Sequence, residues 1–220
     1  DGTLLCVSRT GGQIVRDVIG THIGRPIITD GIRFSGRTDY PIIREVLIAS
    51  GLDEAEAEDV LPEVVAAYQE KALEILSARR VDLLPGAREL LENLSGRDDV
   101  VLGLLTGNIE SLAYAKLGAC SVDHHFTFGA FGSDCEDRYE LPPIAVGRAF
   151  EETGHRFVGK DVVIIGDTEH DILCGRSIGV YAVAVATGLF DREYLGIHEP
   201  DLLLDDLTDS SQFVTSVFQD

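Results

Sequence analysis

Lysine is scarce in this chain and occurs only at positions 71, 116 and 160. Aspartate and glutamate outnumber lysine and arginine by 38 to 18, which gives a formal net charge of −20. Because such a surface repels polyanions, we expect neither a nucleic acid nor an anionic membrane as a partner. A small anionic substrate would need local positive charge at its binding site.

Three other features are missing. No apolar run approaches the roughly 18 to 20 residues that span a bilayer, and no signal peptide is visible. The four cysteines, at positions 6, 120, 135 and 174, include no C-x-x-C pair, so the sequence predicts neither a zinc site nor a disulfide framework. We therefore expect reduced thiols and a cytoplasmic protein.

From about Pro85 onward, short apolar runs alternate with stretches in which apolar residues recur at helical spacing. The runs cover residues 100–105, 126–131, 162–166, 181–186 and 202–204, and the helical patterns cover 109–117, 141–153 and 169–179. Strands that are apolar at every position are buried on both faces, which is typical of parallel strands covered by helices. The sequence therefore predicts an α/β fold with a doubly wound parallel sheet.

The segment from about Thr10 to Arg80 has a different pattern. Amphipathic helices are predicted over 11–23, 40–50 and 58–80, and Asp53 is a candidate helix cap. We predict two domains on this basis: an α/β core made of residues 1–10 and 81–220, and a helical domain of residues 11–80 inserted after the first strand.

Polar residues follow the predicted strands directly. Ligands of such sheets bind outside the carboxyl ends of the strands, so these residues are expected to converge. They are Asp1, Gly2 and Thr3 at the beginning of the chain, Thr106, Gly107 and Asn108, then Asp134, Asp137 and Arg138, and finally Asp167 and Asp171. Carboxylates suit Mg²⁺, whereas hydroxyls, backbone amides and arginine suit phosphate oxygens.

Three stretches in this order resemble a known family. "DGTLL", "LLTGN" and "IIGDTEHD" are similar to motifs I, II and IV of the haloacid dehalogenase-like hydrolases, with an α-helical cap inserted after motif I. The "GRTD" of residues 36–39 is similar to the cap of the phosphoglycolate-phosphatase-like branch. The resemblance covers essentially the whole chain and implies a Rossmann-like core with a cap domain.

The resemblance also implies roles for motif I and motif II. The family's motif I reads D-x-D-G-T, and Asp1 matches its second aspartate, so the nucleophilic aspartate is expected two residues before Asp1. That carboxylate attacks phosphorus and forms an aspartyl-phosphate, while Asp1 acts as general acid and then general base. Thr106, with the amides of Gly107 and Asn108, is expected to bind the phosphoryl oxygens.

The resemblance also implies metal ligands in motif IV and a basic residue in motif III. Mg²⁺ is expected on the nucleophile, the backbone carbonyl of Asp1 and Asp167, with Asp171 holding metal-bound water. The family usually has lysine in motif III, often as K-P-x-P, but this chain has "CEDRYELPP". We assign that role to Arg138, whose charge is permanent and whose donors form a fork. The rivals Lys116 and Lys160 are expected to point away from the site.

The cap leaves two interpretations open for Arg37. It binds a substrate carboxylate or a second phosphate across the cleft, or it pairs with a cap carboxylate such as Asp39. His170 lies inside motif IV and is expected to face outward from its helix.

Together these features predict a Mg²⁺-dependent phosphoric monoester hydrolase that acts on a small phosphorylated metabolite, as a monomer or homodimer. Asp1 favours this over dehalogenation, because a halide leaving group needs no proton. A sugar-phosphate mutase on the same core is one alternative. A non-catalytic binding or regulatory protein is the other, if no nucleophile precedes Asp1.

Overall fold

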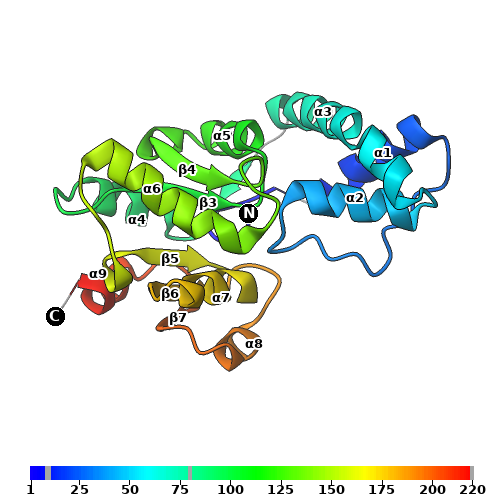
Figure 1. Ribbon diagram of the computed structural model, residues 1–220. Helices are drawn as coiled ribbons and strands as arrows, with labels where there is room; N and C mark the ends of the chain where they lie inside the picture. Colours follow the sequence, from blue (N-terminus) through cyan, green and yellow to red (C-terminus); the bar gives the residue numbers. More distant parts are fainter. Residues whose placement is uncertain (8–10, 79–80, 219–220) are drawn as a thin grey trace.

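The computed structural model describes residues 1–7, 11–78 and 81–218 (Figure 1). Its strands are β1 (Leu5–Cys6), β2 (Asp82–Leu83), β3 (Gly103–Thr106), β4 (Phe128–Phe131), β5 (Val163–Gly166), β6 (Tyr181–Val185) and β7 (Leu202–Leu204). Its α-helices are α1 (Gly11–Ile23), α2 (Asp39–Ala49), α3 (Glu54–Ala78), α4 (Ala87–Ser95), α5 (Glu110–Ala119), α6 (Leu141–Thr153), α7 (Glu169–Ser177), α8 (Arg192–Ile197) and α9 (Ser210–Phe218).

The larger strands are parallel and form two groups. β3 pairs with β4, and β5, β6 and β7 pair in that order. The predicted parallel α/β fold is confirmed, although β3 begins at Gly103 rather than at residue 100. The other edges of β3 and β5 have no strand partner within the described ranges 1–7, 11–78 and 81–218. A short antiparallel pair of β1 with β2, which the sequence did not predict, lies where the inserted helices leave and rejoin the core.

The burial of β6 explains why its sequence is apolar at every position. Ala182 and Ala184 pack with buried residues of α7 and α8, whereas Val183 and Val185 pack with buried residues of α4 and α9. Since successive side chains of a strand point to opposite faces, helices cover both sides of this part of the sheet. This is the doubly wound arrangement that the continuous apolar runs predicted.

Helices α1, α2 and α3 form the insertion between β1 and β2. Helix α3 begins at Glu54, four residues before the predicted start at 58, because Asp53 caps it: the backbone N–H of Glu56 donates to Asp53 Oδ1 at 2.9 Å. Buried residues of α1, α2 and α3 belong to one hydrophobic cluster with Leu104 of β3 and Leu112 of α5. The inserted helices therefore pack directly on the β3 side of the core, while the two-domain boundary remains a prediction.

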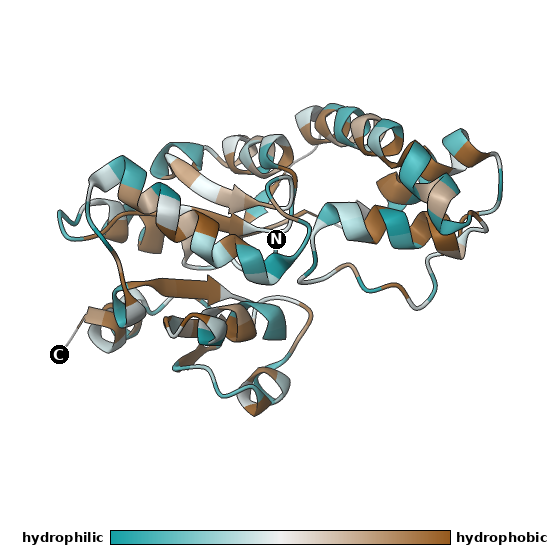
Figure 2. Ribbon diagram, viewed as in Figure 1, coloured by the Kyte–Doolittle hydropathy of each residue, from teal (hydrophilic) through white to brown (hydrophobic). Residues whose placement is uncertain are grey.

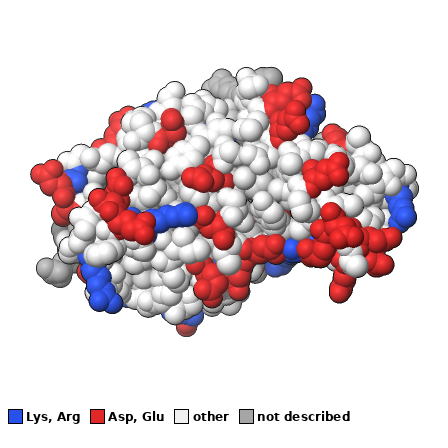
Figure 3. Space-filling view, turned by 45° about the horizontal axis from the view of Figure 1, so that its top comes forward, with Lys and Arg blue, Asp and Glu red and all other residues white. Residues whose placement is uncertain are grey.

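Among the charged side chains of the surface, acidic ones predominate. In Figure 3, aspartate and glutamate are spread over the visible face, and lysine and arginine appear only in small isolated groups. Apolar residues concentrate instead on the strands and on one side of the helices, and β5 is apolar along its length in Figure 2. Among the described helices, none is both long and apolar enough to cross a bilayer.

Candidate active site

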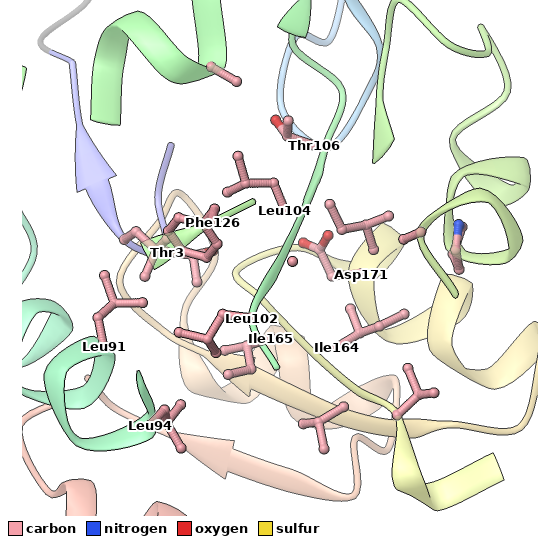
Figure 4. Close-up of a pocket in the computed structure, with 18 of the residues that line it drawn as sticks. Thr3, Leu91, Leu94, Leu102, Leu104, Thr106, Phe126, Ile164, Ile165 and Asp171 are labelled. Atoms are coloured by element: carbon pink, nitrogen blue, oxygen red, sulfur yellow. The ribbon is translucent and has the colours of Figure 1, made fainter. Parts of the chain in front are cut away.

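A cavity of about 440 Å³ lies between the two groups of strands. Leu102 and Leu104 line it from the β3 side, and Ile164 and Ile165 line it from the β5 side (Figure 4). We call this space the interstrand cavity. Its lining becomes polar at the carboxyl ends of the strands, where we define its mouth by Asp1, Thr106, Gly107, Asn108, Lys116, Arg138, Asp167 and Asp171. The structure thus brings Asp1, Thr106, Gly107, Asn108, Arg138, Asp167 and Asp171 to the mouth of one cavity. Asp134 and Asp137 were also expected there, but Asp134 pairs with Arg148 and Asp137 caps the 3₁₀ turn before α6.

The loop after β3 presents donors for an anion. The N–H of Asn108 donates to Thr106 Oγ1 at 3.2 Å, which holds the loop in a tight turn. The carbonyl of Gly107 accepts from the N–H of Asp39 at 2.9 Å. A Cβ on Gly107 would lie 2.1 Å from the carbonyl oxygen of Arg37, so only glycine fits beneath the insertion here. The loop geometry is therefore fixed by contacts with the inserted segment.

Asp39 is a buried residue that the sequence interpretation placed only as a partner for Arg37. Its carboxylate instead accepts a hydrogen bond from the backbone N–H of Ile109 at 2.9 Å, at the beginning of α5. Burial raises the pKa of this carboxyl above its ordinary value. Arg37 donates to Glu45 and, at 3.1 Å, to the carbonyl of Arg33. Arg37 therefore pairs with a carboxylate of its own segment, and the carboxylate is Glu45 rather than Asp39.

Two carboxylates follow β5 at the opposite side of the mouth. Asp167 Oδ1 accepts from the hydroxyl of Thr3 at 2.8 Å. Asp171 Oδ2 accepts from the N–H and the hydroxyl of Thr168 at 3.1 and 2.7 Å, and its Oδ1 accepts from Arg138. Each carboxylate is thus held in place, and Asp171 is fully engaged.

The two carboxylates have opposite pKa shifts. Burial, followed by the nearby charge of Asp171, raises the pKa of Asp167 to about 6. Burial acts in the same direction on Asp171, but the Arg138 guanidinium and the hydrogen bonds from Thr168 outweigh it and lower the pKa of Asp171 below its ordinary value. The surroundings of Asp171 therefore favour its ionised form more strongly than those of Asp167 do.

Gly2 explains the "DGT" sequence in physical terms. Its φ of 81° lies in the left-handed region, and a Cβ at this position would come within 2.1 Å of Asp167 Oδ2. A Cβ on Gly188 would come within 1.9 Å of the same oxygen. Thr3 then donates to the other oxygen of Asp167. The first turn of the chain and the segment after β6 together form a close-fitting cradle for this carboxylate.

The mouth supplies only a partial donor set for Mg²⁺. Within the described part of the chain, no group of three or more histidine, cysteine, aspartate or glutamate side chains is arranged to hold a metal ion. The implied ligands include only one side-chain carboxylate from these residues, that of Asp167, together with the carbonyl of Asp1. Asp167 Oδ2 faces the cradle and has no hydrogen bond among the described residues, so this oxygen is available as a ligand. These residues fit part of the coordination sphere of a hard cation.

Arg138 is the first residue of a short 3₁₀ helix, Arg138–Glu140, which lies directly before α6. Its side chain is 12% exposed, and its hydrogen bond to Asp171 places it on the carboxylate side of the mouth. Its Nε atom is buried without a partner in the described structure. Arg138 reaches the site as predicted, but it contacts Asp171 and not the loop of Thr106.

Lys116 corrects the sequence interpretation. It was expected to point away, yet its Nζ donates to Asp1 Oδ2 and, at 2.6 Å, to Asn108 Oδ1. The sequence did contain an indication of this position. Lys116 lies seven residues, or about two helical turns, after Ile109, so it lies on the same face of α5 as the residue that directly follows motif II. Burial lowers the pKa of Lys116 to about 8. Lys160 does point away, to Asp201 at 2.6 Å.

His170 is the second correction. Its side chain is 27% exposed and lies under the inserted segment, where a Cβ on Gly36 would come within 2.6 Å of the ring. Its Nδ1 is 3.4 Å from the hydroxyl of Tyr139. Its neighbour Glu169 is buried and pairs with Arg33 of the insertion at 3.3 Å. The N-terminal turn of α7 therefore contacts the loop between α1 and α2 of the insertion, which helical periodicity alone did not reveal.

Comparisons with known proteins agree with this geometry. Residues 141–210 match the Hydrolase_like family model, which is described as HAD-hydrolase-like. A phosphoglycolate phosphatase of Synechococcus elongatus is 29% identical over 63% of this chain and 62% of its own length. A phosphoglycolate phosphatase of Pseudomonas fluorescens is 24% identical over 94% of this chain and 74% of its own length.

A solved structure of similar fold is the β-phosphoglucomutase of Clostridium difficile. It superposes with a TM-score of 0.72 at 18% identity and covers 99% of this chain and 93% of its own. This likeness confirms the fold, and with the sequence matches it confirms the resemblance that the three motifs predicted. The chain spans less than two thirds of the Synechococcus relative.

Proposed function

We propose that this chain, which resembles the haloacid dehalogenase-like hydrolases, is a Mg²⁺-dependent phosphatase that hydrolyses the phosphate ester of a small metabolite. One observation carries the proposal. Anion-binding groups after β3 and carboxylates after β5 face each other across the mouth of a single cavity, with Asp1 between them. Phosphoryl transfer requires this combination, because a phosphate dianion must be held close to carboxylates that would otherwise repel it.

The nucleophile is proposed to be an aspartate two residues before Asp1, carried on a strand that fills the interstrand cavity. Two features support this placement. The free edges of β3 and β5 both lack strand partners among the described residues, and the lining between them is apolar. A parallel strand between these edges would satisfy the backbone groups of both.

The residues on the β3 side bind the substrate phosphate. The hydroxyl of Thr106 and the amides of Gly107 and Asn108 donate to the phosphoryl oxygens and orient the phosphorus for attack. The nucleophilic carboxylate then forms a bond to phosphorus while the ester P–O bond breaks. The carboxyl of Asp1 gives its proton to the leaving alkoxide.

The second step regenerates the site. Asp1, now ionised, takes a proton from water, the oxygen of that water attacks phosphorus, and the bond between phosphorus and the nucleophilic carboxylate breaks. Asp167 and the carbonyl of Asp1 would hold Mg²⁺, with Asp171 and Arg138 positioning the metal side of the site. Bound there, Mg²⁺ would offset the charge of a carboxylate that meets a phosphate dianion.

The substrate class follows from size and charge. The relatives that match this chain include proteins named phosphoglycolate phosphatase and pyrophosphatase PpaX, which suggests a small phosphorylated acid or pyrophosphate. The interstrand cavity is not available to a substrate if a strand fills it, so the substrate must bind at the mouth. There the inserted segment of Phe34–Arg37 also lines the space.

Phosphate release from a panel of esters, measured with and without Mg²⁺ on the full natural polypeptide, tests this proposal. The panel contains 2-phosphoglycolate, pyrophosphate and several sugar phosphates. Hydrolysis of at least one compound that requires Mg²⁺ is expected. Isomerisation of a sugar phosphate without release would favour the mutase alternative, and binding without any turnover would favour a regulatory protein. Either result would overturn the proposed hydrolysis.

A further inference from the structure

Two cations at the mouth have different partners. Arg138 donates to Asp171 on the β5 side, whereas Lys116 donates to Asp1 and to Asn108 on the β3 side. Arg37 also lines the cavity, but Glu45 holds its guanidinium. Of the described basic residues that line this cavity, Lys116 is therefore the one whose side chain donates to the loop of Thr106, Gly107 and Asn108.

The position of Lys116 is well defined. Its side chain is 15% exposed. It projects from α5, and this helix also packs against the inserted helix α3. A lysine ammonium has three N–H donors, and two of them are used by Asp1 and Asn108. The third is available to an acceptor that approaches the mouth. Burial of this ammonium costs free energy, and its hydrogen bonds to Asp1 and Asn108 offset that cost.

We propose that Lys116 binds the substrate phosphoryl group and positions Asp1 against it, while Arg138 is restricted to orienting Asp171. This inference rests on the proposed function and assigns the phosphate-side charge to a residue of α5, outside the segment that usually carries motif III. A single ammonium joins the general acid, the amide side chain of the phosphate-binding loop and the phosphoryl oxygen. Substrate binding and proton transfer thereby depend on the same side chain.

The matched variants are Lys116→Gln, which removes the charge, Lys116→Met, which preserves the packing of the stem, and Lys116→Arg, which restores a cation. Lys160→Gln is the control, because Lys160 binds Asp201 and the carbonyl of Val180 and lies outside the mouth. Circular dichroism establishes that each variant is folded. If Lys116→Gln fails to fold, Lys116→Met provides the same comparison.

The measurement is the affinity for inorganic phosphate in the presence of Mg²⁺, by calorimetric titration of the full natural polypeptide. Loss of one charge-assisted hydrogen bond is expected to weaken phosphate binding about 10-fold or more in Lys116→Gln and Lys116→Met. Lys116→Arg should recover most of the affinity, and Lys160→Gln should not differ from the unaltered protein. Affinity for Mg²⁺ alone should be unchanged, since Asp167 is held by Thr3.

The outcomes separate this inference from the proposed function. If the unaltered protein binds phosphate with Mg²⁺ but both neutral variants bind it equally well, Lys116 has no phosphate-binding role and the proposed function stands. Equal losses of phosphate and Mg²⁺ affinity would mean that Lys116 only maintains the fold of the site, which also overturns the inference. If the unaltered protein binds no phosphate at all, the proposed function fails and the inference fails with it.

Discussion

The two groups of strands are similar in their interiors and differ at their carboxyl ends. β3–β4 and β5–β7 are both apolar and parallel, and each borders the interstrand cavity. After β3, however, the chain presents a hydroxyl and backbone amides, whereas after β5 it presents the carboxylates of Asp167 and Asp171. One half therefore presents hydrogen-bond donors that suit an anion, and the other presents carboxylates that suit a cation.

The carboxyl ends of the two groups of strands can therefore differ in charge although the strands themselves are alike in composition. The cations follow the same division, because Lys116 is on the anion-binding side and Arg138 compensates the carboxylates. Asp1 lies at the boundary, linked to Lys116 directly and to Asp167 through the turn of Gly2 and Thr3. A substitution on one side should therefore change the affinity for one ligand, phosphate or Mg²⁺, and leave the affinity for the other unchanged.

The largest effect is expected from Asp167→Asn. Loss of the carboxylate charge should weaken Mg²⁺ binding by about 100-fold or more, since changes even outside the direct ligands of a metal commonly cost 10- to 100-fold. Phosphate release should fall with it. Calorimetric titration with Mg²⁺ measures the affinity, and Asp205→Asn, at an exposed aspartate that pairs with Arg192, is the control. Unaltered Mg²⁺ affinity would remove Asp167 from the metal site.

A pair of glycine substitutions tests the division most symmetrically. Gly188→Ala places a Cβ 1.9 Å from Asp167 Oδ2 and should weaken Mg²⁺ binding by roughly 10-fold. Gly107→Ala places a Cβ 2.1 Å from the carbonyl of Arg37 and should displace the phosphate-binding loop instead. Titration of each variant with Mg²⁺ and with phosphate gives four affinities. The division is wrong if both variants lose the same ligand.

A smaller effect is expected from Thr106→Val. The substitution preserves the shape of the side chain but removes the hydroxyl that accepts from Asn108 and is proposed to donate to phosphate. One such hydrogen bond contributes about 1 kcal/mol, so phosphate affinity should fall about 5-fold, with no change for Mg²⁺. Thr106→Ser should bind phosphate normally. Equal affinities for all three proteins would exclude the hydroxyl from the site.

The smallest effects concern acid stability, and one ion pair from each half is suited to test them. Arg148 lowers the pKa of Asp134 on the β4 side. On the β6 side, the hydrogen bonds from Ala182 and Lys160 outweigh burial and lower the pKa of Asp201. Because these folded pKa values lie below the ordinary 3.8, the stabilisation is complete above that pH and is lost as the pH falls through the lower, folded values.

Asp134→Asn and Asp201→Asn should each reduce the change in the free energy of unfolding between neutral and acid pH. The reduction should be no more than about 1 kcal/mol, as is usual for partly exposed ion pairs. Urea unfolding between pH 2 and pH 7 measures the effect. A variant that loses as much stability at pH 2 as at pH 7 would show that its ion pair is not the cause.

Much of the fold was predictable from the sequence because both faces of its strands are buried. Continuous apolar runs located β3 to β7 to within a few residues, and the polar residues after them identified the mouth of the cavity. The pairing of β1 with β2 was not predictable, since two-residue strands carry no periodicity. The start of α3 was predicted four residues late, although its cap Asp53 was recognised.

The contacts between elements were the part that the sequence could not supply. Lys116 was expected to point away from the site because it lies late in α5. The sequence did not show that Asp1 lies beside this part of the helix. Arg37 pairs with Glu45 eight residues later, and Asp39 instead binds the start of α5. These pairings depend on how the inserted helices pack on the core, which no local pattern encodes.

The central claim is that a strand before Asp1 delivers a nucleophilic aspartate between the anion-binding and cation-binding sides. Trapping the covalent phosphoenzyme of the full natural polypeptide with Mg²⁺ and substrate, followed by peptide mapping with mass spectrometry, tests it directly. The account predicts a phosphoryl group on an aspartate two residues before Asp1. Phosphorylation at Asp1 itself or at any other side chain would contradict it.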